Sequence, residues 1–217
     1  MNEARKIKKI VEIFEKFAHR YDNWYKKHQI LFKNELSAIR EILPKGLGVD
    51  IGTGTGIFAN ELKIDIGLDP SLNMLKIAKE RQIEVIRGVA EFLPFKRNCF
   101  DFALMIVTLC FVNRPIEALK EAYRILKPRG QLIICIIPRD SPWGSFYQAK
   151  DSPFYKSAQF FTISEVKELL NKTGFEPLCY VATLSFCPAD KPYLEKPSRY
   201  VKDHGFVCIK AVAKDYT

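Results

Sequence analysis

The segment that most constrains the fold of this chain is residues 48–56, Gly-Val-Asp-Ile-Gly-Thr-Gly-Thr-Gly, where an apolar strand runs into a glycine-rich turn. A second apolar strand, residues 64–68, follows and ends on Asp69. The stretch between them is long enough for one short crossover helix. These residues therefore predict a βαβ unit, with the turn at the carboxyl edge of a parallel sheet. Glycine in the turn lets the backbone approach a ligand with no Cβ in the way.

The positions of the acidic residues indicate which ligand this turn holds. Asp69, at the end of the second strand, is placed to accept hydrogen bonds from two ribose hydroxyls. A dinucleotide fingerprint reads Gly-x-Gly-x-x-Gly, whereas here Gly56 comes one place early and Ile57 occupies the fingerprint position. Asp50 lies two residues before the first glycine, where it would repel a pyrophosphate but suits a cationic head such as an amino acid's ammonium group. Alone, such a loop is also found as a plain strand-to-helix turn.

Two downstream segments extend the pattern. Residues 88–95, Gly-Val-Ala-Glu-Phe-Leu-Pro-Phe, precede an apolar strand, and residues 117–132 read as a helix, a Lys-Pro-Arg-Gly turn and another strand. Together with Asp50, the glycine-rich turn and Asp69, these segments resemble the class I S-adenosylmethionine-dependent methyltransferases. The similarity is strongest to the type 11 subgroup, which includes ubiquinone and menaquinone biosynthesis methyltransferases. Residues 17–25 resemble that subgroup's Ala-x-x-Tyr-Asp-x-Trp lead-in, and the resemblance runs from about Phe14 to Phe175.

This resemblance implies S-adenosylmethionine as cofactor and methyl transfer as the reaction. In the family, the first-strand acid and the loop hold the methionine part, the second-strand acid holds the ribose, and residues 88–95 wrap the adenine. The cofactor-binding residues implied are Tyr21, Asp50, Gly52, Thr53, Gly54, Asp69, Pro70, Met74, Ala90, Glu91 and Thr108. By the same analogy, Tyr21 closes over the methyl-bearing end of the cofactor or simply packs there.

Two residues depart from the family pattern. Val89 replaces the usual aspartate that accepts from the adenine amine, so that amine must find Glu91, a backbone carbonyl or water. Arg129 replaces the first glycine of a Lys-Pro-Gly-Gly turn. Gly130 remains, and we expect it to supply the positive φ that such a turn requires.

The alternation of expected strands and helices predicts a parallel sheet with helices on both faces. With the family resemblance, this implies a Rossmann-like, doubly wound, mostly parallel seven-stranded sheet with an antiparallel C-terminal hairpin and an N-terminal helical lid. We expect one domain over residues 1–217, with the lid at 1–44, the cofactor-binding core at 45–137, and an aromatic loop, last helix and hairpin at 138–217. Ser71 is expected to cap a helix, and Thr162 with Glu165 reads as a capping box. The predicted helices are 6–17, 24–43, 56–62, 71–81 and 115–127, and the predicted strands are 47–51, 64–68, 84–87, 101–107, 131–137, 178–186 and 205–213.

The stretch 138–161 is predicted to be a long loop rich in aromatic residues. Long loops in compact domains are often functional, and this one follows the fifth strand, at the edge where open α/β sheets bind ligands. With the N-terminal helices, it is the candidate acceptor pocket, although its aromatic residues could also only cover the core. We expect the segments near Tyr21 and Trp143 to be mobile without ligand and ordered with it. The aromatic residues are Trp143, Phe146, Tyr147, Phe154, Tyr155, Phe160 and Phe161.

Composition predicts a cytoplasmic enzyme. With 47% apolar and 27% charged residues the chain is ordinary for a globular domain, and no apolar run reaches the ~18 residues of a membrane span. The charged segment Met1–Lys9 lacks the apolar region of a secretory signal. The six cysteines are scattered without zinc spacing, so no metal is expected and buried reduced thiols are favoured over disulfides. They are Cys99, Cys110, Cys135, Cys179, Cys187 and Cys208.

A small-molecule methyl acceptor is the favoured substrate. The Asp/Asn-Pro-Pro-Tyr motif of nucleobase amino-methyltransferases is missing after the fourth strand, where residues 108–111 read Thr-Leu-Cys-Phe. The net charge of +9 leaves an RNA or protein acceptor open, but no dense basic stripe is visible. A protein that binds the cofactor without turnover is also open. His19 lies beside the Tyr21 lead-in and could reach the pocket, although an exposed helix histidine is the favoured interpretation. His28 and His204 have no motif support, so no catalytic residue is assigned.

Overall fold

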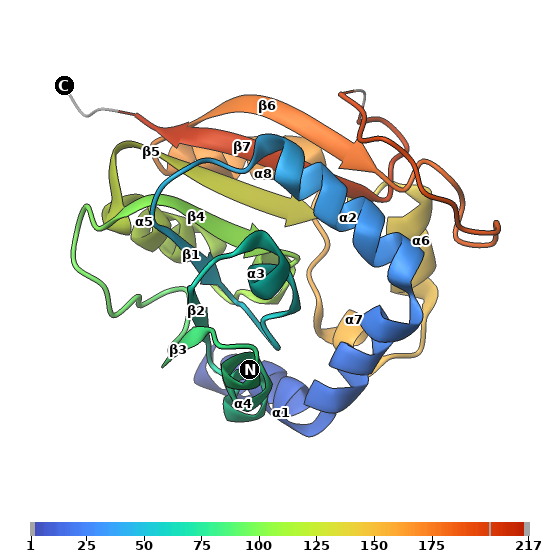
Figure 1. The fold of residues 1–217 in the computed structure, drawn as a ribbon, viewed down its shortest axis with the longest axis horizontal. Helices are drawn as coiled ribbons and strands as arrows, with labels where there is room; N and C mark the ends of the chain where they lie inside the picture. The colour runs from blue at the N-terminus through green and yellow to red at the C-terminus, as the bar shows by residue number, and fades with distance from the viewer. Residues whose placement is uncertain (1–2, 200, 215–217) are drawn as a thin grey trace.

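The computed structural model describes residues 3–199 and 201–214. Its centre is one sheet of seven strands in the order β3-β2-β1-β4-β5-β7-β6 (Figure 1). The first five strands pair in parallel, and β7 is antiparallel to both of its neighbours. The predicted mostly parallel sheet with an antiparallel C-terminal hairpin is confirmed. The strands are β1 (Gly48–Ile51), β2 (Ile66–Asp69), β3 (Glu84–Arg87), β4 (Phe100–Ile106), β5 (Leu126–Ile136), β6 (Phe175–Thr183) and β7 (Phe206–Ala213).

The order of the strands creates a crevice beside β1. From β1 the chain proceeds to β2 and β3 on one side and then crosses to β4 and β5 on the other. At such a switch point the connections leave in opposite directions, so the carboxyl ends of the two central strands face an open space, which is where α/β sheets bind ligands. Gly52 follows β1 and Thr108 follows β4, and both lie at this edge.

Two hydrophobic clusters cover the two faces of the sheet. On one face, α5 (Pro115–Ile125) and α8 (Ile163–Lys172) pack on residues such as Leu132 and Ile134. On the other, α2 (Gln29–Ile42) and α3 (Ile57–Leu62) pack on Ile133 and Cys135. Neighbouring residues of β5 thus face opposite clusters, as strand geometry requires. Figure 1 shows α2 lying across the sheet above β7.

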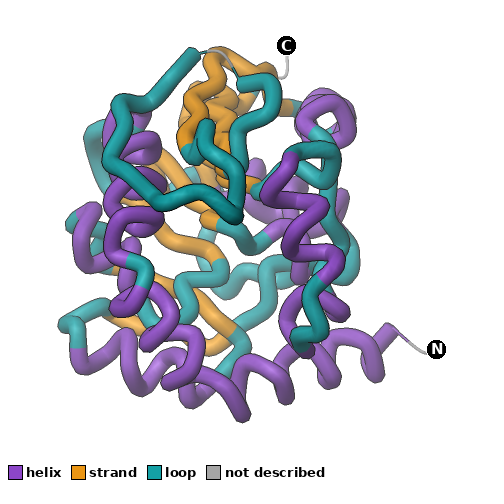
Figure 2. Tube along the Cα trace, turned by 90° about the vertical axis from the view of Figure 1, so that its right-hand side faces the viewer, coloured by secondary structure: helices purple, strands orange, loops and turns teal. Residues whose placement is uncertain are grey.

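The N-terminal helices differ from their predicted bounds. The first, α1 (Glu3–Lys27), continues through the predicted gap with only a break in helical geometry at Phe17, where φ is −117° and ψ is 20°. The helix ends at Lys27, and His28 alone separates it from α2. The helix runs along α4 (Leu72–Glu80), which begins at the predicted cap: the Ser71 hydroxyl accepts from the Met74 amide at 3.2 Å. In Figure 2, α1 forms the lower edge of the molecule.

The stretch 138–161 is not a loop, which corrects the prediction. It forms α6 (Pro142–Ala149) and α7 (Pro153–Ser157), each preceded by a serine, and the Ser141 hydroxyl accepts from the Gly144 amide at 2.9 Å. A serine cap followed by proline is a typical helix start. The predicted capping box of α8 is confirmed, since Thr162 and Glu165 bond reciprocally.

Two further predictions about the C-terminal half were wrong. The positive φ that we expected at Gly130 falls on Arg129, at 58°, within the first part of β5. Gly130 is needed for space instead, because a Cβ there would lie 2.8 Å from the Lys127 carbonyl oxygen. Cys135 and Cys208 face each other on β5 and β7 and form a disulfide, with Cα atoms 4.1 Å apart. The other four cysteines are free.

Candidate functional site

A cavity of about 200 Å³ opens at the carboxyl edge of β1 and β4, under α1. It extends from the glycine-rich turn to the space between α2, α6 and α7. Nine of the eleven predicted cofactor residues line it, so the structure brings most of them together at one edge of the sheet. These are Tyr21, Gly52, Gly54, Asp69, Pro70, Met74, Ala90, Glu91 and Thr108.

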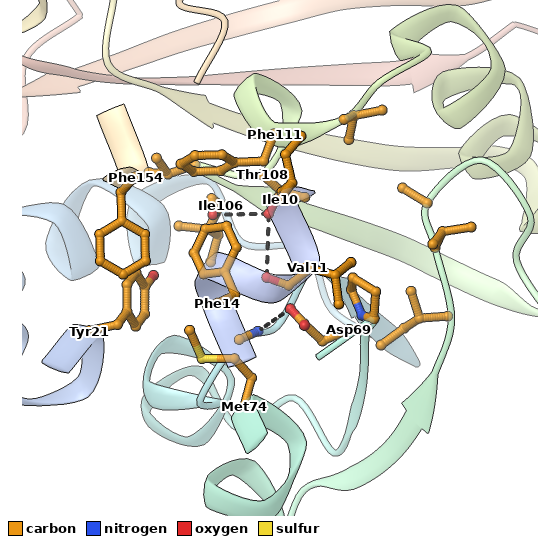
Figure 3. A pocket seen from close by; sticks show the side chains of 18 of the residues that line it. Ile10, Val11, Phe14, Tyr21, Asp69, Met74, Ile106, Thr108, Phe111 and Phe154 are labelled. Atoms are coloured by element: carbon orange, nitrogen blue, oxygen red, sulfur yellow. Dashed lines mark hydrogen bonds between the residues drawn. The ribbon is translucent and has the colours of Figure 1, made fainter. Parts of the chain in front are cut away.

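The glycine-rich turn forms one wall of this cavity. Gly52, Gly54 and Gly56 all have positive φ, between 55° and 77°. A Cβ on Gly52 would lie 2.3 Å from the Thr108 side chain, so that a larger residue would overlap the end of β4. The Thr108 hydroxyl donates to the carbonyl oxygens of Ile106 and Gly52, at 3.1 and 3.4 Å (Figure 3). The turn therefore exposes backbone to the cavity, as a ligand cradle requires.

Asp69 connects the turn to the second strand. Its Oδ2 accepts from the Gly54 amide at 3.0 Å (Figure 3). Its Oδ1 accepts from the Ser71 amide at 2.8 Å. Burial raises the pKa of this carboxyl to about 6, against the lowering effect of the two amides. A carboxylate offers about four acceptor positions, so two remain for ligand hydroxyls.

Asp50 and Thr53 are the two predicted residues outside the lining of the cavity. Both are buried behind the turn, and neither the Asp50 Oδ1 nor the Thr53 hydroxyl has a hydrogen-bond partner. Burial raises the pKa of Asp50 to about 7. A buried carboxylate oxygen without a partner is costly, which is why burial shifts the pKa of this acid upward.

The adenine-side segment is arranged around Glu91. Its Oε1 accepts from the amides of Asn113 and Arg114, at 3.1 and 3.2 Å. Glu91 therefore stabilises the start of α5, and one of its two carboxylate oxygens is used in these hydrogen bonds. Val89 and Ala90 line the cavity beside it.

The backbone is strained where β4 ends. Val107 has a φ of 50°, which is rare for a β-branched side chain. Its amide donates to the Cys135 carbonyl at 2.8 Å, and this bond holds it in place. Both Val107 and Thr108 line the cavity as a result. Strain of this kind is typical of positions that shape a site.

The first half of α1 covers the cavity, and Glu15 fastens it there. Ile10, Val11 and Phe14 point down onto the space beside Asp69 (Figure 3). The two Glu15 carboxylate oxygens accept from the first amides of α4, Leu72 at 2.6 Å and Asn73 at 2.9 Å. A carboxylate at a helix N-terminus is stabilised by unpaired amides and by the helix dipole.

Replacing Glu15 with alanine is expected to loosen this cover. The loss of a side-chain cap costs ~1 kcal/mol, so the amides of residues 7–15 should exchange hydrogen about fivefold faster. Hydrogen exchange by mass spectrometry measures this directly. Glu12→Ala is the matched control, because Glu12 makes only an exposed pair with Lys8. Equal exchange in both variants would show that Glu15 does not hold the cover.

The far end of the cavity is a chamber of aromatic rings. Tyr25 packs edge-on against Tyr21, with ring centroids 5.4 Å apart, and Tyr147 lies 4.6 Å from Tyr155. Trp24 and Phe154 also line this end. Phe154 lies directly above Tyr21 in Figure 3. Three of the predicted acceptor-pocket aromatics, Tyr147, Phe154 and Tyr155, thus reach the cavity.

The remaining aromatic residues of 138–161 lie outside the cavity lining. Trp143, on α6, is buried against Gly205, and its Nε1 donates to the Phe186 carbonyl at 2.7 Å. Phe161 packs in the core beneath α8, and Phe146 is exposed. The three histidines also lie outside the lining. Trp143 is therefore a core residue and not a wall of the acceptor pocket.

Glu35 is the site residue that the sequence interpretation missed. It lies on the buried side of α2, is 5% exposed, and lines the aromatic chamber. Its Oε2 has no hydrogen-bond partner, and burial raises its pKa to about 8. A signal existed: Glu35 comes four residues after Leu31 and four before Ile39, on the apolar stripe of the helix.

Within residues 3–199 and 201–214, no helix is long and apolar enough to cross a bilayer. The same part of the chain holds no group of three or more histidine, cysteine or acidic side chains arranged for a metal ion.

Comparison with known proteins agrees with this geometry. A family model described as "Methyltransferase domain" matches residues 49–134. An uncharacterised protein of Methanocaldococcus jannaschii is 41% identical over 93% of this chain and 98% of its own length. A demethylmenaquinone methyltransferase of Renibacterium salmoninarum is 32% identical over 61% of this chain and 55% of its own.

A solved structure from Thermotoga maritima is similar over almost the whole chain. It is described as a "SAM-dependent methyltransferase, possible histamine N-methyltransferase", with 44% identity and a TM-score of 0.91, and the match covers 94% of this chain and 100% of that one. The sheet order, the glycine-rich turn and the acid after β2 are the features expected of such enzymes. The chain belongs to the class I S-adenosylmethionine-dependent methyltransferases of type 11, and its cofactor is S-adenosylmethionine.

Proposed function

We propose that this enzyme methylates a small molecule bound in the aromatic chamber between α1, α2, α6 and α7. The observation that carries the proposal is the continuity of the cavity, which joins the glycine-rich turn to the rings of Tyr21, Tyr25 and Tyr147. A donor at the turn and an acceptor among the rings would therefore meet inside one enclosed space. A cytoplasmic location stays a prediction from composition.

The residues around the turn fit the cofactor. Asp50 and the backbone at Gly52 and Gly54 would hold the methionine part, since the Asp50 Oδ1 lacks a partner and matches an ammonium group. The free acceptor positions of Asp69 would bind the ribose hydroxyls. Met74, Ala90 and Glu91 would surround the adenine.

Catalysis in this site depends on the alignment of the two reactants and on the exclusion of water. The bound cofactor supplies a sulfonium whose methyl group is already activated for transfer. The chain's task is to hold the acceptor atom in line with that methyl group, and such orientation can lower a barrier by roughly 7–11 kcal/mol. Ile10, Val11 and Phe14 of α1 would cover the two reactants and keep water away.

The charge around the cavity argues against a nucleic-acid acceptor. Of the described residues that line it, Arg20 alone is basic, and its guanidinium lies 5.7 Å from the Phe17 ring. An RNA substrate would need basic side chains that converge on the same opening. The excess of positive charge is spread over other surfaces, so an RNA acceptor is not favoured.

Transfer of a labelled methyl group tests the proposal. The enzyme is incubated with labelled S-adenosylmethionine and either a metabolite panel or total RNA. We expect label in a metabolite and none in RNA or protein. Label in RNA alone would overturn the small-molecule acceptor, and binding of the cofactor without any transfer would favour a non-catalytic role.

Cofactor binding is expected to raise the melting temperature. A ligand present at 100 times its Kd stabilises by about 2.7 kcal/mol, which in a protein of this size corresponds to roughly 5–10 °C. S-adenosylmethionine and its demethylated product should both give this shift in a thermal melt, and NAD should give none. A shift with NAD alone would contradict the roles assigned to Asp50 and Asp69.

A further inference from the structure

The aromatic chamber contains a buried carboxyl group, Glu35, for which the described part of the chain supplies no ion pair. Glu35 is 5% exposed, and its Oε2 has no hydrogen-bond partner. Of the other buried acids, Asp22 is paired with Arg81 and Lys26. Asp69 and Glu91 accept from backbone amides, and Asp50 Oδ1, behind the glycine-rich turn, is the other carboxylate oxygen without a partner among the described residues. An unpaired buried carboxyl is costly, so its retention in a binding cavity indicates a ligand that supplies the partner.

The surroundings of Glu35 define the chemistry of that partner. Tyr21 and Tyr25 approach from α1, Tyr147 from α6 and Tyr155 from α7, and each interacts electrostatically with Glu35. Rings around a negative charge form a cage for a cation, because the faces of aromatic rings attract positive charge. The basic residue in the lining, Arg20, lies against Phe17 and so leaves the carboxylate without a cation.

We propose that Glu35 is the binding and proton-accepting residue for an amine substrate, so that the acceptor atom is nitrogen. This deepens the proposed function, on which it rests. The substrate class is a primary or secondary amine that enters as its ammonium form. The apolar rings bind the rest of the molecule, and Glu35 binds the charged end.

The proton balance of this reaction is complete within the site. Glu35 Oε2 takes one proton from the ammonium group, which breaks an N–H bond, forms an O–H bond and leaves a lone pair on nitrogen. That lone pair forms the N–C bond while the S–C bond of the sulfonium breaks and sulfur keeps its electron pair. Glu35 returns its proton to solvent when α1 opens. An apolar cavity favours the neutral amine and carboxylic acid over the desolvated ion pair. The free energy of this proton transfer is therefore more favourable in the cavity than in water.

Binding of matched amines and alcohols tests the proposal. The probes are 2-phenylethylamine, hexylamine and 2-(imidazol-4-yl)ethylamine, each against its neutral alcohol, titrated by calorimetry with and without the demethylated cofactor. At least one amine should bind tenfold or more tighter than its alcohol. In Glu35→Gln this preference should disappear while alcohol affinity stays the same. Glu41→Gln on the same helix is the control, because Glu41 makes only a surface pair with Arg199.

The pH dependence of amine affinity distinguishes a charge-pairing role of Glu35 from a role in packing alone. The pKa of Glu35 is about 8, so at lower pH it must lose a proton before it binds an ammonium group. Amine affinity should therefore rise with pH up to about 8 and then level off, whereas Glu35→Gln should show no such rise. On the other elements against α2, Glu61 of α3 is paired with Arg40 and Glu195 is bonded to Ser185, and both lie outside the lining of the cavity.

Two further results would decide against the amine site. An equal affinity for every amine and its alcohol would overturn it, and so would a preference that survives in Glu35→Gln. Glu35→Asp keeps the charge on a shorter side chain and should recover part of the preference, which also guards against a folding defect in the first variant. Failure of the demethylated cofactor to bind would instead contradict the proposed function, and the amine-to-alcohol ratio would still be measured without it.

Discussion

Replacing Arg81 with alanine is expected to lower the free energy of unfolding by about 3 kcal/mol. Arg81 ends α4, and its guanidinium bonds both the Asp22 carboxylate and the Thr55 carbonyl at 2.6 Å. The Asp22 side chain is 4% exposed, and removing one partner of a buried pair typically costs 3–5 kcal/mol. The low end applies because Lys26 still contacts Asp22 at 2.8 Å. A thermal melt should show a loss of roughly 6–12 °C.

An exposed pair provides the control for this measurement. Arg40 contacts Glu61 at 3.1 Å with both side chains about half exposed, so Arg40→Ala should cost less than ~1 kcal/mol. Burial raises the pKa of Asp22, but Lys26 and Arg81 outweigh it and hold the pKa below its usual value. The stabilisation is therefore present at neutral pH and is lost as the pH falls through the folded-state pKa. Similar losses in the two variants would show that the buried pair adds no stability.

Replacing Asp69 with alanine is expected to weaken cofactor binding by roughly 10- to 150-fold. Loss of hydrogen bonds to a charged group costs about 1.5–3 kcal/mol, which corresponds to that range. The effect should fall at its upper end, because Asp69 also holds the amides of Gly54 and Ser71 that shape the turn. Calorimetry with the demethylated cofactor measures the change.

The control for Asp69 is an acid at the opposite end of the sheet. Asp101, near the start of β4, bonds the Leu47 amide and Lys127, away from the cavity. Asp101→Ala should leave cofactor affinity as it is. An Asp69→Ala variant that binds as tightly as the parent protein would show that the ribose is held elsewhere.

The cofactor half of the cavity could be predicted because its signals are local in the chain. The turn at Gly52–Gly56 and the acid at Asp69 follow directly from two short strands, and parallel strands place both at one edge. The helix caps could be predicted in the same way, since Ser71 and Thr162 each begin a helix as expected. The same reasoning missed α6 and α7, although Ser-Pro begins each of them, because the aromatic content of the stretch suggested a loop.

Two contacts between distant segments could not be predicted from local patterns. The Asp22–Arg81 pair joins residues 59 positions apart, and the Cys135–Cys208 disulfide joins residues 73 apart. The second pairing follows from the register of β5 against β7, and strand pattern alone does not determine register between non-consecutive strands.

By itself, the sequence determined the family, the sheet and most of the residues that line the cofactor half of the cavity, because each depends on spacing within short stretches of chain. Only the tertiary structure decided what Glu35 does. On the helix it is one acid in an apolar stripe, and its role appears when α1, α6 and α7 bring Tyr25, Tyr147 and Tyr155 around it. A carboxylate's free energy depends on what surrounds it in three dimensions, so its burial and its missing partner cannot be read along one helix.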